Sequence, residues 1–298
     1  QNCDCLILSH ECLFQSPNAI YNYCYLAKGV VEKVTIIGYS RRQSSFFKSQ
    51  YSQWLFRAPE RIKEVNDTMT QIRLDQSVFT GLERQLIASI ENDFYSARQL
   101  SGCSIHDWNS SYGNIAFLTK PLGVDIRCGV LPDPSSSGQT LIQDFCAKAS
   151  LSLRPEVVNV SINTRRNQAW DDDVLEAINR SIVIGLDMMG PHEKNETIDK
   201  LSALVEQSPP PINVFLSSLE HYIDWFYWPS NQNFCIQYGL DPMYFMPGPQ
   251  ISKQEISAVI ALENRKRTEN QVIVKEKYQM LAARMTKLCM SLIQASRN

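Results

Sequence analysis

The chain has 298 residues, of which 44% are hydrophobic, a fraction that is ordinary for a globular protein with a substantial core. Its formal net charge is only −2 and no basic block interrupts it, which argues against a nucleic-acid-binding protein. Nine cysteines in a chain of this length do not suit a small disulfide framework, so we expect a reducing, cytoplasmic compartment. No apolar run has the length of a membrane span and no signal peptide is recognisable, so no membrane association is predicted.

The N-terminal residues form an apolar run that ends in polar side chains. Residues 5–9, CLILS, predict a buried strand, and His10 and Glu11 follow it directly. Polar residues just past the carboxyl end of a parallel strand are where α/β folds place their chemistry. Histidine titrates nearest neutral pH and a glutamate can do so when it is buried, so either side chain could act as a general base. The alternative is that one of them only caps the following helix.

A strand, an arginine and a helix follow one another in the most informative part of the chain. Residues 34–39, VTIIGY, predict a buried parallel strand, and a helix is expected over about residues 43–56. Helix N-termini attract anions, and an arginine adds a bidentate donor. Arg41 leaves the strand and Ser49 comes eight residues later on the helix, so the two could bind one phosphate group. The alternative is an ordinary solvated helix start.

This segment resembles the 3′-phosphate-binding motif of sulfotransferases that use PAPS, 3′-phosphoadenosine 5′-phosphosulfate. In that motif a strand is followed by Arg, then by Ser eight residues on, then by Tyr, which is Tyr51 here. The segment is most similar to the bacterial members, which have Arg-Arg-Gln at this step. The resemblance implies a three-layer, P-loop-like α/β fold in which helices flank a parallel sheet. It also implies that Arg41 and Ser49 hold the 3′-phosphate, with Arg42 as a further candidate.

The resemblance also bears on the base. In the family, the strand that precedes the Arg/Ser motif ends in the group that takes a proton from the acceptor hydroxyl. Cytosolic members have Thr-His there and bacterial members often have Ser-Ser-Glu, and this chain offers both His10 and Glu11. We favour Glu11 slightly because the bacterial members carry Glu at that step.

The other elements before residue 190 predict an α/β core. Thr80 and Glu83 have the spacing of a capping box at the start of a helix. Residues 112–118, YGNIAFL, resemble a short strand of the family that follows a Trp, and the pair Asp144-Phe145 also matches the family. Strands that alternate with helices favour a parallel sheet. Helices are expected over about residues 18–28, 81–100 and from Leu141 onward, a strand over 112–118, and a loop or short lid helix over 60–79.

A second basic segment lies between residues 159 and 170. It is polar, contains Arg165 and Arg166, and precedes a helix that Asp171 can cap. In sulfotransferases a late loop with basic residues closes over the 3′-phosphate, so the resemblance implies that Arg165 or Arg166 completes the phosphate site. The alternative is a solvated loop.

The C-terminal third is expected to be a mostly helical extension, residues 191–298, on a core formed by residues 1–190. Residues 221–228 are strongly aromatic and could form an acceptor platform, although a packed helix is the commoner fate of such a run. Ser252 and Glu255 form a second capping box, and apolar residues then recur at three- and four-residue steps to about residue 295. This helix could pack on the core or mediate homo-oligomer formation.

A working sulfotransferase needs one further element, a Gly/Ser/Thr-rich loop with a lysine that holds the 5′-phosphosulfate. We find no such loop in the sequence. In the family it precedes the strand that ends at His10 and Glu11, and this chain opens on Gln1 rather than Met. We therefore expect that an N-terminal segment is missing here, or that catalysis has been lost.

The sequence predicts sulfuryl transfer from PAPS to a hydroxyl or amine of a small molecule or glycan. No metal is required, and Cys3, Cys5 and Cys12 lack the spaced partners of a zinc site. The first alternative is a catalytically inactive relative that acts as a binding or scaffold protein. The second is a nucleotide-sugar glycosyltransferase, but Asp171 to Asp173 are better explained as a helix cap than as a metal motif.

Overall fold

The computed structural model describes residues 5–8, 16–57, 59–91, 106–131, 141–152 and 213–270, and of residues 52–62 it describes the main chain alone. The chain forms two compact units, with junctions at Arg42/Gln43, Trp225/Phe226 and Met246/Pro247. Within the described residues, no helix is both long and apolar enough to cross a membrane. The domain boundary predicted at residue 190 falls outside these residues and stays a prediction.

The described elements divide between the units as follows. Unit 1 contains α1 (Pro17–Lys28), β1 (Thr35–Ser40), α5 (Trp108–Thr119), η4 (Lys120–Leu122), β2 (Asp125–Val130), α6 (Leu141–Ala149), the second part of α11 (Val214–Tyr238) and η5 (Pro242–Phe245). Unit 2 contains α2 (Gln43–Arg57), α3 (Pro59–Gln71), η2 (Gln76–Val78), α4 (Gly81–Glu91), the first part of α11 and α12 (Lys253–Glu269).

The described part of unit 1 contains a two-stranded parallel sheet. β1 pairs with β2 in a register that runs from Thr35 opposite Asp125 to Ser40 opposite Val130. Parallel strands need a long crossover connection, and here it contains α2 to α5. β1 confirms the strand predicted at residues 34–39.

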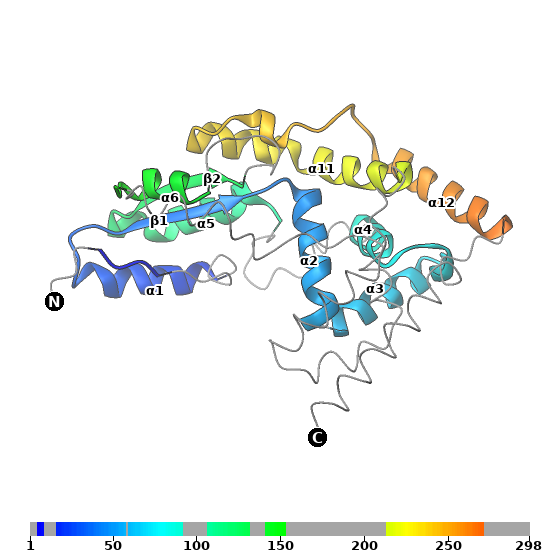
Figure 1. The fold of residues 1–298 in the computed structure, drawn as a ribbon, viewed down its shortest axis with the longest axis horizontal. Helices are drawn as coiled ribbons and strands as arrows, with labels where there is room; N and C mark the ends of the chain where they lie inside the picture. The colour runs from blue at the N-terminus through cyan, green and yellow to red at the C-terminus, as the bar shows by residue number, and fades with distance from the viewer. Residues whose placement is uncertain are drawn as a thin grey trace, which may run out of the picture. The chain divides into compact units, whose positions relative to one another are not determined.

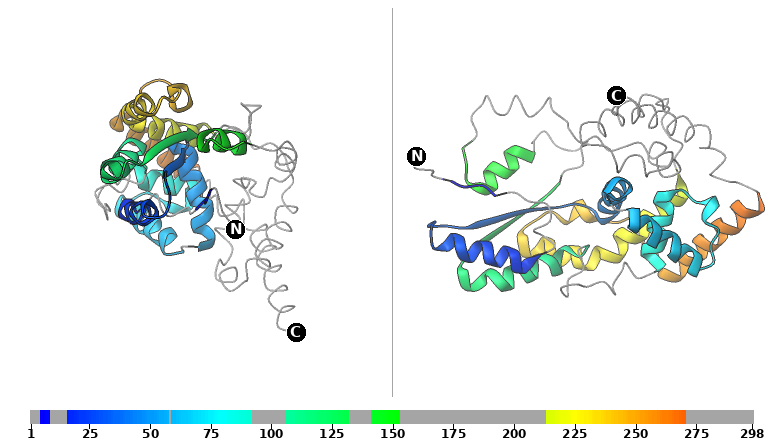
Figure 2. Two further views of the ribbon diagram at one scale, coloured as in Figure 1. Left: turned by 90° about the vertical axis from the view of Figure 1, so that its left-hand side faces the viewer. Right: turned by 90° about the horizontal axis from the view of Figure 1, so that it is seen from below.

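Helices cover both faces of this sheet. Successive side chains of a strand point to opposite faces, so Ile36 and Ile126 meet α1 and α5, which lie side by side in Figures 1 and 2. Tyr39 points the other way, and its hydroxyl donates a hydrogen bond of 2.7 Å to Asp144 Oδ2 on α6. The buried cluster on the α1/α5 side consists of Ile20, Cys24, Ile115 and Leu122. The described part of the chain is thus mostly helical with a small parallel sheet, which is compatible with the predicted mixed α/β class.

Two expected strands are corrected by the structure. Residues 112–118 belong to helix α5, because Asp107 caps its N-terminus by accepting a hydrogen bond of 3.0 Å from Ser110 N. Residues 5–8 form no regular element and are exposed, since Leu6 and Leu8 keep 72% and 66% of their surface accessible. An apolar run becomes a strand only if its backbone groups find a partner, and composition alone does not supply one.

The described elements of unit 2 are helices, and both predicted capping boxes are present among them. Glu83 N donates to Thr80 Oγ1 at 3.2 Å while Thr80 N donates to Glu83 Oε2 at 2.8 Å, which starts α4. Ser252 and Glu255 start α12 in the same way. Residues 59–71 form α3, so the short-helix alternative for this stretch is confirmed. The expected continuations of α4 towards residue 100 and of α12 towards residue 295 lie outside the described residues.

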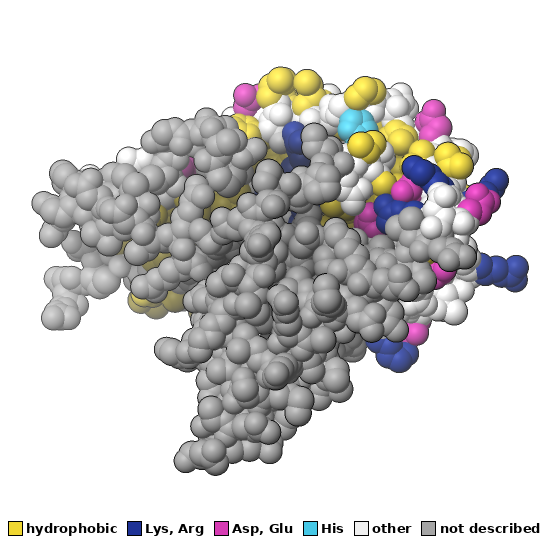
Figure 3. Space-filling model, turned by 45° about the vertical axis from the view of Figure 1, so that its right-hand side comes forward, with side chains coloured by type: hydrophobic (Ala, Val, Ile, Leu, Met, Phe, Trp, Pro, Cys, Tyr) yellow, Lys and Arg dark blue, Asp and Glu magenta, His cyan; other side chains and the backbone are white. Residues whose placement is uncertain are grey.

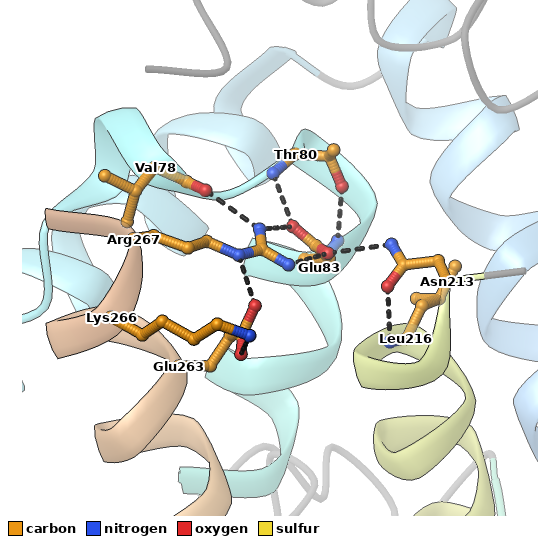
Figure 4. A network of polar contacts seen from close by, with 8 residues as sticks. All are labelled: Val78, Thr80, Glu83, Asn213, Leu216, Glu263, Lys266 and Arg267. Carbon is orange, nitrogen blue, oxygen red and sulfur yellow. Dashed lines mark hydrogen bonds and ion pairs between the residues drawn. The ribbon is translucent and has the colours of Figure 1, made fainter. Parts of the chain in front are cut away.

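A buried ion pair connects three elements of unit 2. Arg267 of α12 donates to both carboxylate oxygens of Glu83, from Nη1 at 2.9 Å and from Nη2 at 3.1 Å (Figure 4). Asn213, just before α11, donates to Glu83 Oε1 at 3.0 Å. The guanidinium also donates to Val78 O and lies 5.3 Å from the ring centroid of Phe79. Both oxygens of the fully buried Glu83 carboxylate therefore accept hydrogen bonds. Because the donors come from α12 and from the residue before α11, the ion pair links α4, α11 and α12.

Surface charge in the described residues is mixed. Basic and acidic side chains lie beside one another on the face drawn in Figure 3, and yellow apolar side chains lie near them. Lys63 and Asp67 form one such exposed pair on α3, with 2.7 Å between Nζ and Oδ2. This pattern fits the small net charge of −2.

Replacement of Gly38 by alanine is expected to destabilise the protein by about 1–3 kcal/mol, because overpacking forces buried groups to move. A Cβ on Gly38 would meet the Tyr112 hydroxyl and lie 2.8 Å from Cε1 of that fully buried ring. Gly113 is the matched control, since its Cβ would meet nothing within 4 Å and alanine favours the interior of α5. Urea denaturation measures both. Equal effects of the two substitutions would contradict this packing.

Candidate functional site

The carboxyl end of β1 carries the residues that the sequence singles out. β1 ends at Ser40, and Arg41 and Arg42 follow it. Ser40 O also accepts a hydrogen bond of 2.7 Å from Leu131 N, the residue after β2, so the two segments stay paired at this end. Ligands of α/β folds bind outside the carboxyl ends of parallel strands, so this edge is a candidate binding site.

Arg41 is a partly buried cation with no carboxylate partner in the part of the chain that the structure describes. Its main-chain oxygen accepts a hydrogen bond of 2.8 Å from Trp108 Nε1. Its guanidinium forms no ion pair or hydrogen bond with any described residue, and burial lowers the pKa of this group. A cation that leaves water without an opposite charge is destabilised, and a bound anion would remove that cost. Arg41 can therefore act as a donor to an external oxyanion.

Arg42 is engaged differently from its neighbour. Its Nη2 donates to Met246 O at 3.1 Å and to Tyr244 O at 3.5 Å. These carbonyls lie at the end of η5 and just after it. The side chain of Arg42 therefore connects the end of β1 to η5 within unit 1. This structural role accounts for an arginine at position 42 without a bound ligand.

The N-terminus of α2 already has an anion. Asp224 of α11 accepts hydrogen bonds from Ser44 N at 3.0 Å and from Ser44 Oγ at 2.9 Å, and both residues are buried in unit 2. A carboxylate here is favoured by the same unpaired N–H groups and helix dipole that would attract a phosphate. Sequence reasoning expected a ligand at this helix start and missed Asp224, which is 180 residues away in the aromatic run.

Ser49 and Tyr51 lie on α2, in unit 2, whereas Arg41 belongs to unit 1. Ser49 is partly buried and Tyr51 is almost wholly buried, with 2% of its surface accessible. The pairing of Arg41 with Ser49 stays a prediction.

The start of α5 supports Arg41 from within unit 1. Trp108 is the first residue of α5 and is buried, and it follows the helix cap Asp107. Asp107 also accepts a hydrogen bond from Ser230 Oγ of α11. His106 is 5% exposed, and burial lowers its pKa to about 3, so its imidazole is neutral near pH 7. Sequence reasoning noted Trp108 only as part of a family pattern, because nothing local connects it with Arg41.

The remaining predicted site residues lie outside the described part of the chain. These are His10, Glu11, Arg165 and Arg166. Their roles as base and as further phosphate ligands therefore stay predictions. Asp144 of the family-like Asp-Phe pair is described, and its carboxylate accepts hydrogen bonds from the Tyr39 hydroxyl and from Lys148 Nζ.

Metal binding and known relatives give no further guide to the site. Within the described ranges, no cluster of His, Cys, Asp or Glu side chains could hold a metal ion. Comparisons of the chain with protein-family models, with curated proteins and with solved structures gave no match. The residues and contacts at the carboxyl end of β1 are therefore the basis for inferring a function.

Proposed function

We propose that this protein binds a nucleotide phosphate group at the carboxyl end of β1, with Arg41 as the main donor. The nucleotide we propose is PAPS, and the reaction is transfer of its sulfuryl group to a hydroxyl or amine of a small molecule or glycan. One observation carries the proposal: a desolvated guanidinium at the carboxyl end of a parallel strand, with no carboxylate partner among the described residues. The sulfotransferase assignment itself comes from the resemblance of the Arg41/Ser49 segment.

In this reaction the acceptor oxygen or nitrogen attacks sulfur while the bond between sulfur and the 5′-phosphate oxygen breaks. Adenosine 3′,5′-bisphosphate leaves, and the acceptor proton passes to a base, for which the sequence offers Glu11 or His10. As in phosphoryl transfer, catalysis comes chiefly from positioning and from neutralising the charge of the phosphates. Arg41 would contribute by fixing the nucleotide through its 3′-phosphate.

Replacement of Arg41 by alanine is expected to weaken binding of adenosine 3′,5′-bisphosphate by roughly 10- to 150-fold. This is the effect of losing a charge-assisted hydrogen bond of about 1.5–3 kcal/mol. Calorimetric titration measures the affinity. Arg265 on α12 is the matched control, because it is exposed and its replacement removes the same charge. Arg265→Ala should leave the affinity unchanged.

A comparison of two nucleotides sharpens this test. Adenosine 5′-monophosphate lacks the 3′-phosphate that Arg41 is proposed to hold. The wild-type protein should therefore prefer the bisphosphate, and Arg41→Ala should lose most of that preference while keeping its affinity for the monophosphate. Unchanged bisphosphate binding in Arg41→Ala would refute the proposed function.

A second candidate function is a binding or scaffold protein that takes up the nucleotide without transferring the sulfuryl group. The observation that favours it is Asp224, whose carboxylate already accepts from Ser44 at the N-terminus of α2, so this helix start would add little to the charge neutralisation that transfer needs. The two candidates differ in one assay. Release of adenosine 3′,5′-bisphosphate from PAPS in the presence of a panel of hydroxyl and amine acceptors supports transfer, and binding without release supports the second candidate.

A further inference from the structure

We propose that Trp108 is a positioning residue for Arg41, and that the two adjacent arginines have separate tasks. Arg41 binds the anion, whereas Trp108 and the side chain of Arg42 hold the backbone at Arg41 and Arg42 in place. This inference rests on the proposed function of Arg41, and it assigns a residue to the site that the sequence motif does not contain.

The indole of Trp108 holds the main chain of Arg41. Its Nε1 donates a hydrogen bond of 2.8 Å to Arg41 O, and only 4% of the residue is exposed. A carbonyl that is shielded from water needs a hydrogen-bond donor. For Arg41 O the donor is the N–H group of a large ring with few alternative rotamers. The bond therefore fixes the peptide group between Arg41 and Arg42. This peptide group is attached to the Cα that carries the Arg41 side chain.

Trp108 is itself fixed by the helix that it begins. Asp107 caps α5 through Ser110 N and also accepts from Ser230 Oγ, so the start of the helix is connected to α11. One turn further on, the buried ring of Tyr112 packs against Gly38 of β1. The donor that holds Arg41 is thus tied to the same sheet from which Arg41 emerges.

Arg42 supplies the second anchor. Its guanidinium donates to the carbonyls of Tyr244 and Met246, so the residue directly after Arg41 is tied to η5. The chain after β1 is therefore held at the main-chain oxygen of Arg41 by an indole and at the side chain of Arg42 by two carbonyls. The Arg41 guanidinium is left without a described partner at a constrained position.

Such constraint raises affinity because less freedom is lost when the ligand binds. Without the indole donor, Arg41 O loses its hydrogen bond and the peptide can rotate, so the guanidinium samples positions that do not match a phosphate. We expect Trp108→Phe, which keeps an aromatic ring but removes the N–H group, to weaken binding of adenosine 3′,5′-bisphosphate by roughly three- to tenfold, the effect of one hydrogen bond.

A double-mutant cycle separates this role from general structural support. The dissociation constant for adenosine 3′,5′-bisphosphate is measured for wild type, Trp108→Phe, Arg41→Ala and the double variant. The loss caused by Trp108→Phe should appear only when Arg41 is present, and it should fall below about twofold in the Arg41→Ala background. Trp228→Phe, which removes another indole N–H group from unit 1, should have no effect in either background.

Arg42→Lys provides a second variant if Trp108→Phe does not fold. It keeps the charge, but a strongly hydrated ammonium on a flexible stem should hold the carbonyls of Tyr244 and Met246 less firmly than the guanidinium does, so it should also weaken binding only when Arg41 is present. If Arg41→Ala weakens binding but neither Trp108→Phe nor Arg42→Lys does, the positioning role is refuted and the function of Arg41 stands. Equal losses in both backgrounds likewise refute it. If Arg41→Ala has no effect, the proposed function and this inference both fail.

Discussion

Replacement of Glu83 by alanine is expected to lower the free energy of unfolding by about 3–5 kcal/mol, because it leaves a buried guanidinium without its carboxylate. Glu83 is fully buried and the side chain of Arg267 is only 14% exposed, so water cannot replace the lost partner. The amide of Asn213 and the N–H of Thr80 lose their acceptors in the same step (Figure 4). Arg267→Ala should destabilise the protein by a similar amount for the converse reason.

Urea denaturation with a matched surface pair tests this account. Lys63 and Asp67 form an ion pair of similar length on α3, but their side chains are 76% and 54% exposed. Lys63→Ala should leave the denaturation midpoint almost unchanged, since solvent screens such pairs. In addition, Glu83→Leu combined with Arg267→Leu should cost less than the sum of the single variants, because no unpaired charge remains. Additive losses, or a Glu83→Ala midpoint close to that of Lys63→Ala, would contradict the buried pair.

Stability is also expected to fall on acidification through His106. Burial lowers the pKa of this imidazole to about 3, whereas an unfolded chain has a histidine pKa near the ordinary value of about 6.5. The unfolded state therefore binds the proton first as the pH falls. The contribution of His106 is fully present above pH 6.5 and is lost between about pH 6.5 and 3, at about 1.4 kcal/mol per pH unit. By pH 5 the loss should reach about 2 kcal/mol.

The comparison that isolates His106 is the slope of stability against pH. Urea denaturation of the wild type and of His106→Gln is followed from pH 7.5 to pH 5, above the range in which most carboxylates titrate. The variant can be less stable at every pH, but its curve should be flatter by about 2 kcal/mol over this range. Parallel curves would show that His106 does not carry the acid sensitivity.

Local chemistry made part of the fold predictable. Thr80 and Glu83, like Ser252 and Glu255, are close in sequence, so the helix starts that they form can be read without tertiary information. The run at residues 34–39 was equally clear, because its β-branched residues are followed by a polar turn.

Elements decided by burial were harder to predict. Residues 112–118 have a composition that favours a strand. In the structure they follow the helix cap Asp107, and Tyr112 and Ile115, which have helical spacing, are both buried in the core. β2 was not predicted, because its Asp125 and Arg127 look like loop residues. They pair with each other, and Arg127 also donates to Lys148 O at the end of α6.

The candidate site also has a part that the sequence predicts and a part that only tertiary packing reveals. The position of Arg41 at the carboxyl end of a strand follows from the local order of residues. Its support by Trp108 does not, because the two residues are 67 positions apart and meet only after α5 has packed on the sheet. Asp224 at the start of α2 is equally invisible in the sequence, where it appears as one acid in an aromatic run.

The most direct test of the anion site observes the Arg41 guanidinium itself. In a nitrogen-15 spectrum of arginine side chains, the Arg41 Nε–H signal is identified by its absence from Arg41→Lys. Titration with adenosine 3′,5′-bisphosphate should shift this signal along a saturation curve. The signal of Arg127, whose Nε already donates to Asp125, should stay in place. An Arg41 signal that remains at its free position when the protein is saturated with nucleotide would contradict the account.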